Sequence, residues 1–168
     1  WRRVRACGIE PQGKVFIDKM PLNTVLLPLI HRLFPDAKIL FAVRDPRDVV
    51  LSCFRRRFGM NPAMYQMLTL RGAADYYDTV MRLGVLYREK MPLKLREARY
   101  EALVDDFEGE ARLHAAFLGL DWSGAMADFA KTARSRAVNT PSSVQVSRGL
   151  NRDGLDQWRA YADQLTPV

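Results

Sequence analysis

Three residues in this 168-residue chain, Arg44, Ser52 and Arg56, have types and spacing suited to binding a phosphate. Arg44 and Ser52 begin and end the stretch RDPRDVVLS, and Arg56 follows Ser52 after about one helical turn. In a helix this spacing places Ser52 and Arg56 on the face that carries the helix entrance. Two guanidinium groups and a hydroxyl can then surround one phosphate with charge-assisted hydrogen bonds. The alternative is a solvated helix whose arginines at 55–57 form an ordinary charged surface, and the spacing alone leaves both open.

A strand that runs directly into a helix would position these side chains. Residues 39–43 are apolar and have the character of a buried strand. Pro46 suits the first helical position, because its missing N–H would be unpaired there anyway, and Asp45 can cap the free N–H groups. Asp48 adds an acid in the first turn, where the helix dipole favours it. Arg44 would then stand at the C-terminal end of a strand, where open α/β sheets bind ligands, beside a helix N-terminus that favours anions.

The remaining pattern predicts one α/β domain, because strand-like apolar runs alternate with helical segments. The expected strands are residues 15–17, 39–43 and 94–100. The expected helices are residues 22–33, 46–57, 72–91, 106–118, 123–132 and 154–165. Strands separated by helices pair in parallel through right-handed crossovers, so we expect a parallel sheet. The segments 58–70 and 133–152 are expected to be irregular.

The composition narrows the class of ligand. The chain carries 26 Lys and Arg against 19 Asp and Glu, a formal net charge of +7, which indicates an anionic ligand or partner. The basic residues are dispersed and no nucleic-acid-binding motif is present, so we expect no nucleic-acid partner. No apolar run approaches the roughly 20 residues of a membrane span, so no membrane partner is expected. Two cysteines are too few for a disulfide framework or a metal site, and they suit the reducing cytoplasm.

The stretch RDPRDVVLS after an apolar strand resembles the 3′-phosphate-binding segment of sulfotransferases that use 3′-phosphoadenosine-5′-phosphosulfate (PAPS). In that family the arginine and the serine hold the 3′-phosphate of the cofactor, which implies this role for Arg44 and Ser52. Arg56 matches a further phosphate-contacting arginine of the tyrosylprotein sulfotransferase branch.

Two further segments resemble the same family, in the order in which the family has them. Residues 15–23, VFIDKMPLN, resemble the DK-x-P segment of tyrosylprotein-like and bacterial members, which implies that Lys19 lies near the transferred sulfuryl group. The stretch YEAL that begins at Tyr100 resembles the family's Y-E-x-L segment, whose tyrosine contacts the adenine. Apart from the resemblance, Lys19 would be a solvated turn lysine and Tyr100 a strand-end packing residue. With the later segments, the resemblance covers residues 14–165.

The segment TPSSVQV at 140–146 and a closing QWR complete the resemblance. It implies that Ser142 assists the leaving oxygen. The residues implied to anchor the nucleotide here are Ser143, Gln145 and Arg148. The arginine stands one position later than is usual and glycine replaces the usual proline, so Arg148 and Arg152 remain alternatives for the cofactor contact. Gln157 stands where the family usually has a basic residue.

The resemblance implies a P-loop-NTPase-like three-layer α/β sandwich around a central parallel sheet. In that family an N-terminal strand–loop–helix holds the 5′-phosphosulfate on consecutive backbone N–H groups. The only early glycines, Gly8 and Gly13, are isolated and form no such loop. We therefore expect residues 1–168 to be a partial sulfotransferase domain, inactive alone, whose usual catalytic base lies upstream of Trp1. The open edge of its parallel sheet would be prone to self-association.

The implied activity is transfer of a sulfuryl group from PAPS to a hydroxyl-bearing acceptor, either protein tyrosine or a small molecule. Such a reaction depends mainly on positioning and on stabilising charge on the transferred and leaving oxygens. Lys19 and Ser142 are the residues implied for that task, and no metal is implied. Two alternatives remain open: a P-loop kinase-like phosphotransferase, which shares the architecture, and a non-catalytic remnant that binds nucleotide.

Overall fold

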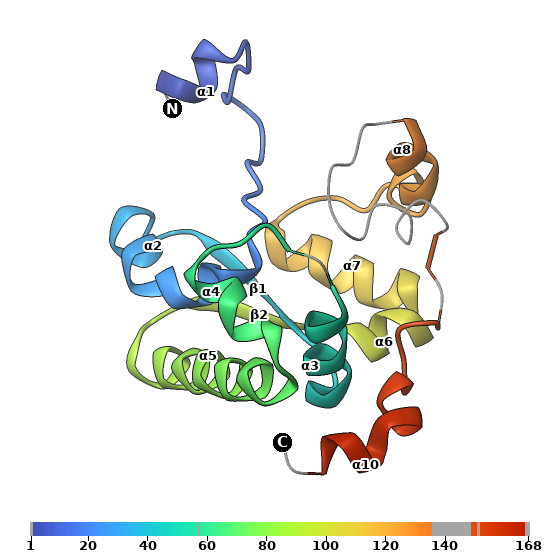
Figure 1. Cartoon of the computed structure of the whole chain (residues 1–168). Helices are drawn as coiled ribbons and strands as arrows, with labels where there is room; N and C mark the ends of the chain where they lie inside the picture. Colours follow the sequence, from blue (N-terminus) through green and yellow to red (C-terminus); the bar gives the residue numbers. More distant parts are fainter. Residues whose placement is uncertain (1, 57, 136–148, 151, 167–168) are drawn as a thin grey trace.

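Two parallel strands, β1 (Lys38–Val43) and β2 (Lys94–Arg99), form the sheet of the described residues (Figure 1). The computed structural model describes residues 2–56, 58–135, 149–150 and 152–166. The strands pair in register from Lys38 opposite Lys94 to Val43 opposite Arg99. This register brings the residues that follow the strands, Arg44 and Tyr100, to the same end of the sheet.

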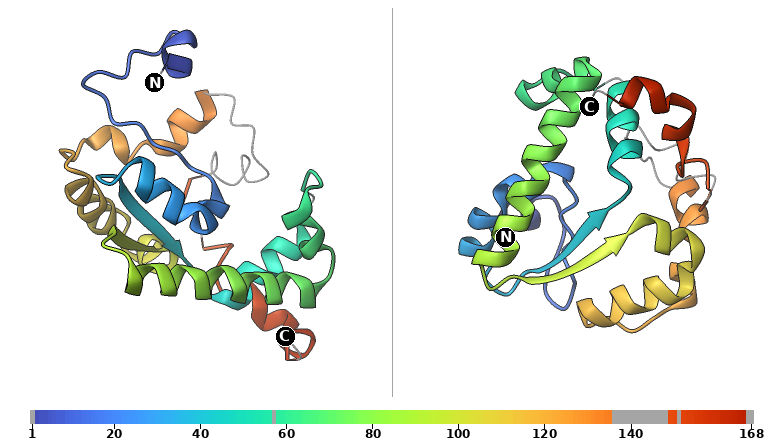
Figure 2. Two further views of the ribbon diagram at one scale, coloured as in Figure 1. Left: turned by 90° about the vertical axis from the view of Figure 1, so that its left-hand side faces the viewer. Right: turned by 90° about the horizontal axis from the view of Figure 1, so that it is seen from below.

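Helices make up most of the rest of the described chain (Figures 1 and 2). In chain order they are α1 (Arg2–Ala6), η1 (Pro21–Leu26), α2 (Leu27–Leu33), α3 (Pro46–Arg55), α4 (Pro62–Tyr65), η2 (Gln66–Leu68), α5 (Leu70–Lys90), α6 (Tyr100–Asp105), α7 (Phe107–Leu118), η3 (Gly124–Met126), α8 (Phe129–Ser135), η4 (Gln157–Tyr161) and α10 (Ala162–Leu165). The elements η1 to η4 are 3-10 helices. Each of the six regions expected to be helical contains helix, and the strands expected at 39–43 and 94–100 are confirmed as β1 and β2.

The strand expected at residues 15–17 is wrong. Val15, Phe16 and Ile17 form no strand, and they are 53%, 58% and 71% exposed. A strand is stabilised by pairing with a neighbouring strand and by burying side chains, and this short, exposed run belongs to no sheet of the described residues. The described sheet therefore has two parallel strands, and the P-loop-NTPase-like sandwich stays an expectation.

Two helical turns were missed in the segment expected to be irregular at 58–70. The side chain of Asn61 caps α4 by accepting a hydrogen bond from the N–H of Met64, and Thr69 caps α5 in the same way from Gly72. An Asn directly before a proline is a helix-start signal that the sequence carried.

None of the helices within the described ranges is long and apolar enough to cross a membrane.

The two longest helices cover opposite faces of the sheet (Figure 2). On one face, the ring of Phe41 lies against Gly84 of α5, and Glu97 of β2 forms an ion pair with Arg88 of the same helix. On the other face, Nε of Arg96 donates a hydrogen bond to Nδ1 of His114 on α7. Successive residues of a strand point to opposite faces, so the positions of Arg96 and Glu97 require this arrangement.

The C-terminal helices pack on α3 rather than on the sheet (Figure 1). Leu165 of α10 is buried together with Val50 of α3 and Ala73 of α5, and Trp158 of η4 packs against this cluster. Burial of apolar surface contributes roughly 25 cal/mol per Å², so these contacts stabilise the docking of the chain end. The last described segment is therefore part of the packed structure beside α3.

Gly84 provides a test of the packing between α5 and the sheet. A Cβ at Gly84 would lie 2.9 Å from Cζ of Phe41, a buried ring. We expect Gly84→Ala to destabilise the fold, because overpacking costs about 1–3 kcal/mol and exceeds the helix-propensity gain of about 1 kcal/mol. Urea unfolding followed by circular dichroism measures the difference. In a Phe41→Leu background the cost of Gly84→Ala should shrink, and an equal cost in both backgrounds would contradict this packing.

Candidate functional site

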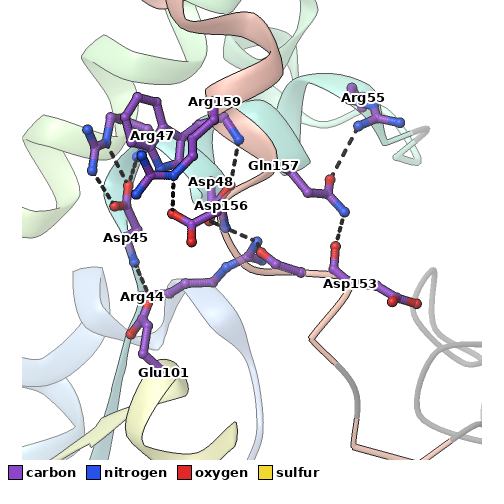
Figure 3. Close-up of polar contacts among 12 residues, drawn as sticks. Arg44, Asp45, Arg47, Asp48, Arg55, Glu101, Asp153, Asp156, Gln157 and Arg159 are labelled. Atoms are coloured by element: carbon purple, nitrogen blue, oxygen red, sulfur yellow. Dashed lines mark hydrogen bonds and ion pairs between the residues drawn. The ribbon is translucent and has the colours of Figure 1, made fainter. Parts of the chain in front are cut away.

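Arg44 follows β1, and its guanidinium is held by several groups (Figure 3). Its Nη2 donates a hydrogen bond to the carbonyl oxygen of Gly154 and lies 3.8 Å from Oδ2 of Asp48. Its guanidinium carbon lies 5.2 Å from the centre of the Tyr100 ring, within cation–π range. Nε of Arg44 is buried and has no hydrogen-bond partner in the part of the chain that the structure describes. A buried donor without a partner is costly, so an additional acceptor oxygen would be favourable here.

The turn from β1 into α3 has the capping that the sequence predicts. Oδ1 of Asp45 accepts a hydrogen bond of 2.9 Å from the N–H of Arg47, at the helix entrance. The guanidinium of Arg47 also donates to both oxygens of this carboxylate, at 3.0 and 2.6 Å. These hydrogen bonds lower the pKa of Asp45 from its ordinary value, so the cap is charged at neutral pH. The start of α3, and with it the place of Arg44, is fixed locally.

Residues that follow β2, the neighbouring strand, also hold the turn between β1 and α3. Oε1 of Glu101 accepts a 2.7 Å hydrogen bond from the N–H of Asp45 (Figure 3). Tyr100, directly before it, lies under the guanidinium of Arg44. Two consecutive residues of α6 therefore contact two consecutive residues of the β1–α3 turn. Sequence reasoning selected Tyr100 and missed Glu101, although the parallel register of β1 and β2 would have placed it there.

Asp48 has a role beyond the helix-dipole position expected for it. Its side chain accepts hydrogen bonds from the backbone N–H groups of Asp156, at 2.9 Å, and Trp158, at 3.0 Å. The guanidinium of Arg47 lies against the Trp158 ring, 3.4 Å from the ring centre. The segment before and within η4 is thus bound to the first turn of α3.

A small polar cavity lies next to this contact. Its volume is about 190 Å³, and the described residues that line it are Ser52, Arg55, Arg56 and Gln157. Nη1 of Arg55 donates a 3.3 Å hydrogen bond to Oε1 of Gln157 across this region. Ser52 and Arg56 therefore line the same cavity, although α3 ends at Arg55 and the backbone of Arg56 is extended. Arg44 is not among the described lining residues, because its guanidinium is turned toward Gly154 and Tyr100.

Several sequence-predicted site residues are not brought into this group. Lys19 lies exposed in the coil between α1 and η1, and it forms no hydrogen bond or ion pair with other described residues. Arg152 is paired at 2.7 Å with Asp105 at the end of α6, on the exposed surface. The positions outside the described residues are Ser142, Ser143, Gln145 and Arg148.

Burial changes two pKa values beside the site. The pKa of the Cys53 thiol on α3 is raised by burial, against the opposing effect of the Arg44 charge, so little thiolate forms at neutral pH. Burial also raises the pKa of the Tyr77 hydroxyl on α5, and the carboxylates of Asp45 and Glu101 add to this rise. Within the described ranges, no three His, Cys, Asp or Glu residues are grouped so that they could hold a metal ion.

Glu101 can be tested as the residue that holds the turn. We expect Glu101→Ala to lower the free energy of unfolding by about 1–3 kcal/mol, because the N–H of Asp45 loses its acceptor. Glu101→Gln keeps a carbonyl oxygen and should lose less. Chemical denaturation of the full chain measures both. Glu108→Ala, which removes an exposed ion pair with Arg112 on α7, is the matched control and should cost below about 1 kcal/mol. Equal losses for the Ala and Gln variants would argue against the hydrogen bond.

Comparison with known proteins identifies relatives with a named activity. The family model described as the sulfotransferase family matches residues 4–124. Over 165 residues, 98% of the chain, it is 27% identical to a protein of Aquifex aeolicus whose name is only "uncharacterized protein". It is 25% identical over 147 residues, 84% of the chain, to a putative protein-tyrosine sulfotransferase of Caenorhabditis briggsae. It is 29% identical over 113 residues, 64% of the chain, to the omega-hydroxy-beta-dihydromenaquinone-9 sulfotransferase Stf3 of Mycobacterium bovis.

The chain spans only part of each of these relatives. The matched region is 21% of the Aquifex protein, 51% of the Caenorhabditis protein and 29% of the Mycobacterium protein. No solved structure matches the chain.

Proposed function

The chain belongs to the sulfotransferase family, and from this premise we propose that it binds PAPS for sulfuryl transfer to an acceptor hydroxyl. The observation that carries the proposal is the polar cavity beside α3. Ser52, Arg55 and Arg56 give it a hydroxyl and two guanidinium groups, the donors that suit a phosphate. Arg44, at the end of β1 and outside the described lining of the cavity, has a buried, unpartnered Nε that an acceptor oxygen would satisfy. The residues present therefore fit a phosphorylated nucleotide.

In the proposed complex, each residue has one task. Arg44, Ser52 and Arg56 hold the 3′-phosphate. Tyr100, whose ring lies beside Arg44, positions the adenine. The further nucleotide contacts proposed from the family resemblance are those of Ser143, Gln145 and Arg148. PAPS supplies the sulfuryl group, and Lys19 and Ser142 stabilise charge on the transferred and leaving oxygens.

The names of two relatives agree on the kind of acceptor. One is named for protein tyrosine, an amino acid whose side chain carries a hydroxyl, and the other for an omega-hydroxy compound. We therefore propose a hydroxyl acceptor, on protein tyrosine or on a small molecule, for this chain. The phosphotransferase alternative requires ATP, whose ribose carries no 3′-phosphate, so nucleotide preference separates the two functions.

Arg44 provides the direct test of 3′-phosphate binding. We expect calorimetry on the full chain to show tighter binding of adenosine 3′,5′-bisphosphate than of adenosine 5′-phosphate or ATP. Arg44→Ala should remove most of this preference, because hydrogen bonds to charged groups contribute about 1.5–3 kcal/mol each. Arg82→Ala, at an exposed ion pair with Asp78 on α5, is the control and should keep the preference. Equal affinity of the wild-type protein for the two adenosine phosphates would refute the assignment, and tighter binding of ATP would favour the phosphotransferase.

Lys19 provides a separate test of the chemical step. A group that acts mainly on the transition state changes kcat more than KM. We expect Lys19→Ala to lower kcat for PAPS-dependent sulfation of a phenolic acceptor by the protein, with little change in the KM for PAPS. Lys14→Ala, an exposed lysine in the same coil, should leave both constants unchanged. A normal kcat in Lys19→Ala would make Lys19 an ordinary surface lysine.

A further inference from the structure

Asp48 is the one charged side chain that is buried among the described residues, with 2% of its surface exposed. Both of its oxygens accept backbone hydrogen bonds from a segment more than a hundred residues later. Oδ2 accepts from Asp156 (Figure 3), and Oδ1 accepts from Trp158. Arg44 is the cation beside it, with Nη2 at 3.8 Å. A buried carboxylate is tolerated when its hydrogen bonds and its charge are satisfied together. Here the distant segment supplies the hydrogen bonds.

Other close contacts require the same segment at the same place. A Cβ on Gly154 would lie 3.0 Å from the Tyr100 hydroxyl, so glycine allows this backbone to approach Tyr100 and accept from Arg44. Arg47 and Arg159 both lie against the ring of Trp158, at 3.4 and 5.1 Å from its centre. Within residues 154–158, the contacts with Arg44, Asp48 and Arg47 are therefore made by Gly154, Asp156 and Trp158.

The position between the two bonded N–H groups is Gln157. Asp156 precedes it and Trp158 follows it, so Asp48 fixes the backbone on both sides of this residue. The side chain of Gln157 bonds Arg55 and lines the cavity with Ser52 and Arg56. One wall of the polar cavity thus comes from the C-terminal segment, while the others come from α3 and the residue that follows it.

We propose that Asp48 is a positioning residue that latches residues 154–158 to the first turn of α3 and so places Gln157 in the wall of the cavity. Taking that cavity as a phosphate site rests on the function proposed above. The latch itself is a property of this chain and can be measured without any ligand. Asp48 does not contact the nucleotide in this proposal; it acts through the segment that it holds.

Hydrogen exchange of the full chain tests the latch. In the wild-type protein, the amides of Asp156 and Trp158 should exchange at least tenfold more slowly than in an unstructured peptide of the same sequence. In Asp48→Asn, one acceptor oxygen becomes an NH₂ group facing an N–H, so exchange at these two amides should rise at least tenfold. Asp163→Asn, an exposed acid in α10, is the control and should leave both amides protected. Unprotected amides in the wild type would overturn the latch even if the Asp48 variant does not fold, and unchanged exchange in a folded Asp48→Asn would overturn it as well.

Nucleotide binding tests the positioning role. If the wild type prefers adenosine 3′,5′-bisphosphate over adenosine 5′-phosphate, Asp48→Asn should reduce that preference at least tenfold. Gln157→Ala should also reduce it while leaving the exchange of the Asp156 and Trp158 amides unchanged, a split that general destabilisation would not produce. A folded Asp48→Asn with wild-type preference would overturn the positioning role. A wild-type protein that binds the two adenosine phosphates equally would refute the 3′-phosphate function. The hydrogen-exchange data alone would then test whether Asp48 holds residues 154–158.

Discussion

A carboxylate buried at the first turn of α3 constrains the structure around it. Asp48 needs hydrogen-bond donors and a nearby cation, because an isolated buried charge is strongly disfavoured. The donors are backbone groups of residues 156 and 158, and the cation is Arg44. Removing one partner of a buried ion pair typically costs about 3–5 kcal/mol. The start of α3, the end of β1 and the C-terminal segment are therefore interdependent parts of one site.

The two-stranded sheet supplies the other half of this geometry. Because β1 and β2 are parallel, both strands finish at the same end of the sheet, where Val43 lies opposite Arg99. The next residues along each strand, Arg44 and Tyr100, then lie within cation–π distance. The helices α5 and α7 hold the strands from opposite faces (Figure 2). The register of the two strands thus brings together the segments that begin at Arg44 and Tyr100, which are far apart in the sequence.

Local signals in the sequence predicted this region well. Asp45, Pro46 and the preceding apolar run have strong local preferences, and the strand, the cap and α3 all follow them. The strand at 15–17 failed because its stability depends on a neighbouring strand, which a local pattern does not reveal. The partners of Asp48 and Glu101 were missed for a related reason. They are backbone N–H groups, which every residue except proline carries, so no residue type in the sequence identifies them.

The contact between Asp48 and the C-terminal segment also bears on how the chain acquires its structure during synthesis. Asp48 and the N–H of Trp158 are 110 residues apart in sequence. Chains emerge from the ribosome N-terminus first, so β1 and α3 are available long before the donors that Asp48 requires. Until then, the carboxylate must stay hydrated, and the first turn of α3 must stay open to water. The packing around Asp48 is therefore completed late, and a premature stop before residue 156 would remove both of these backbone donors.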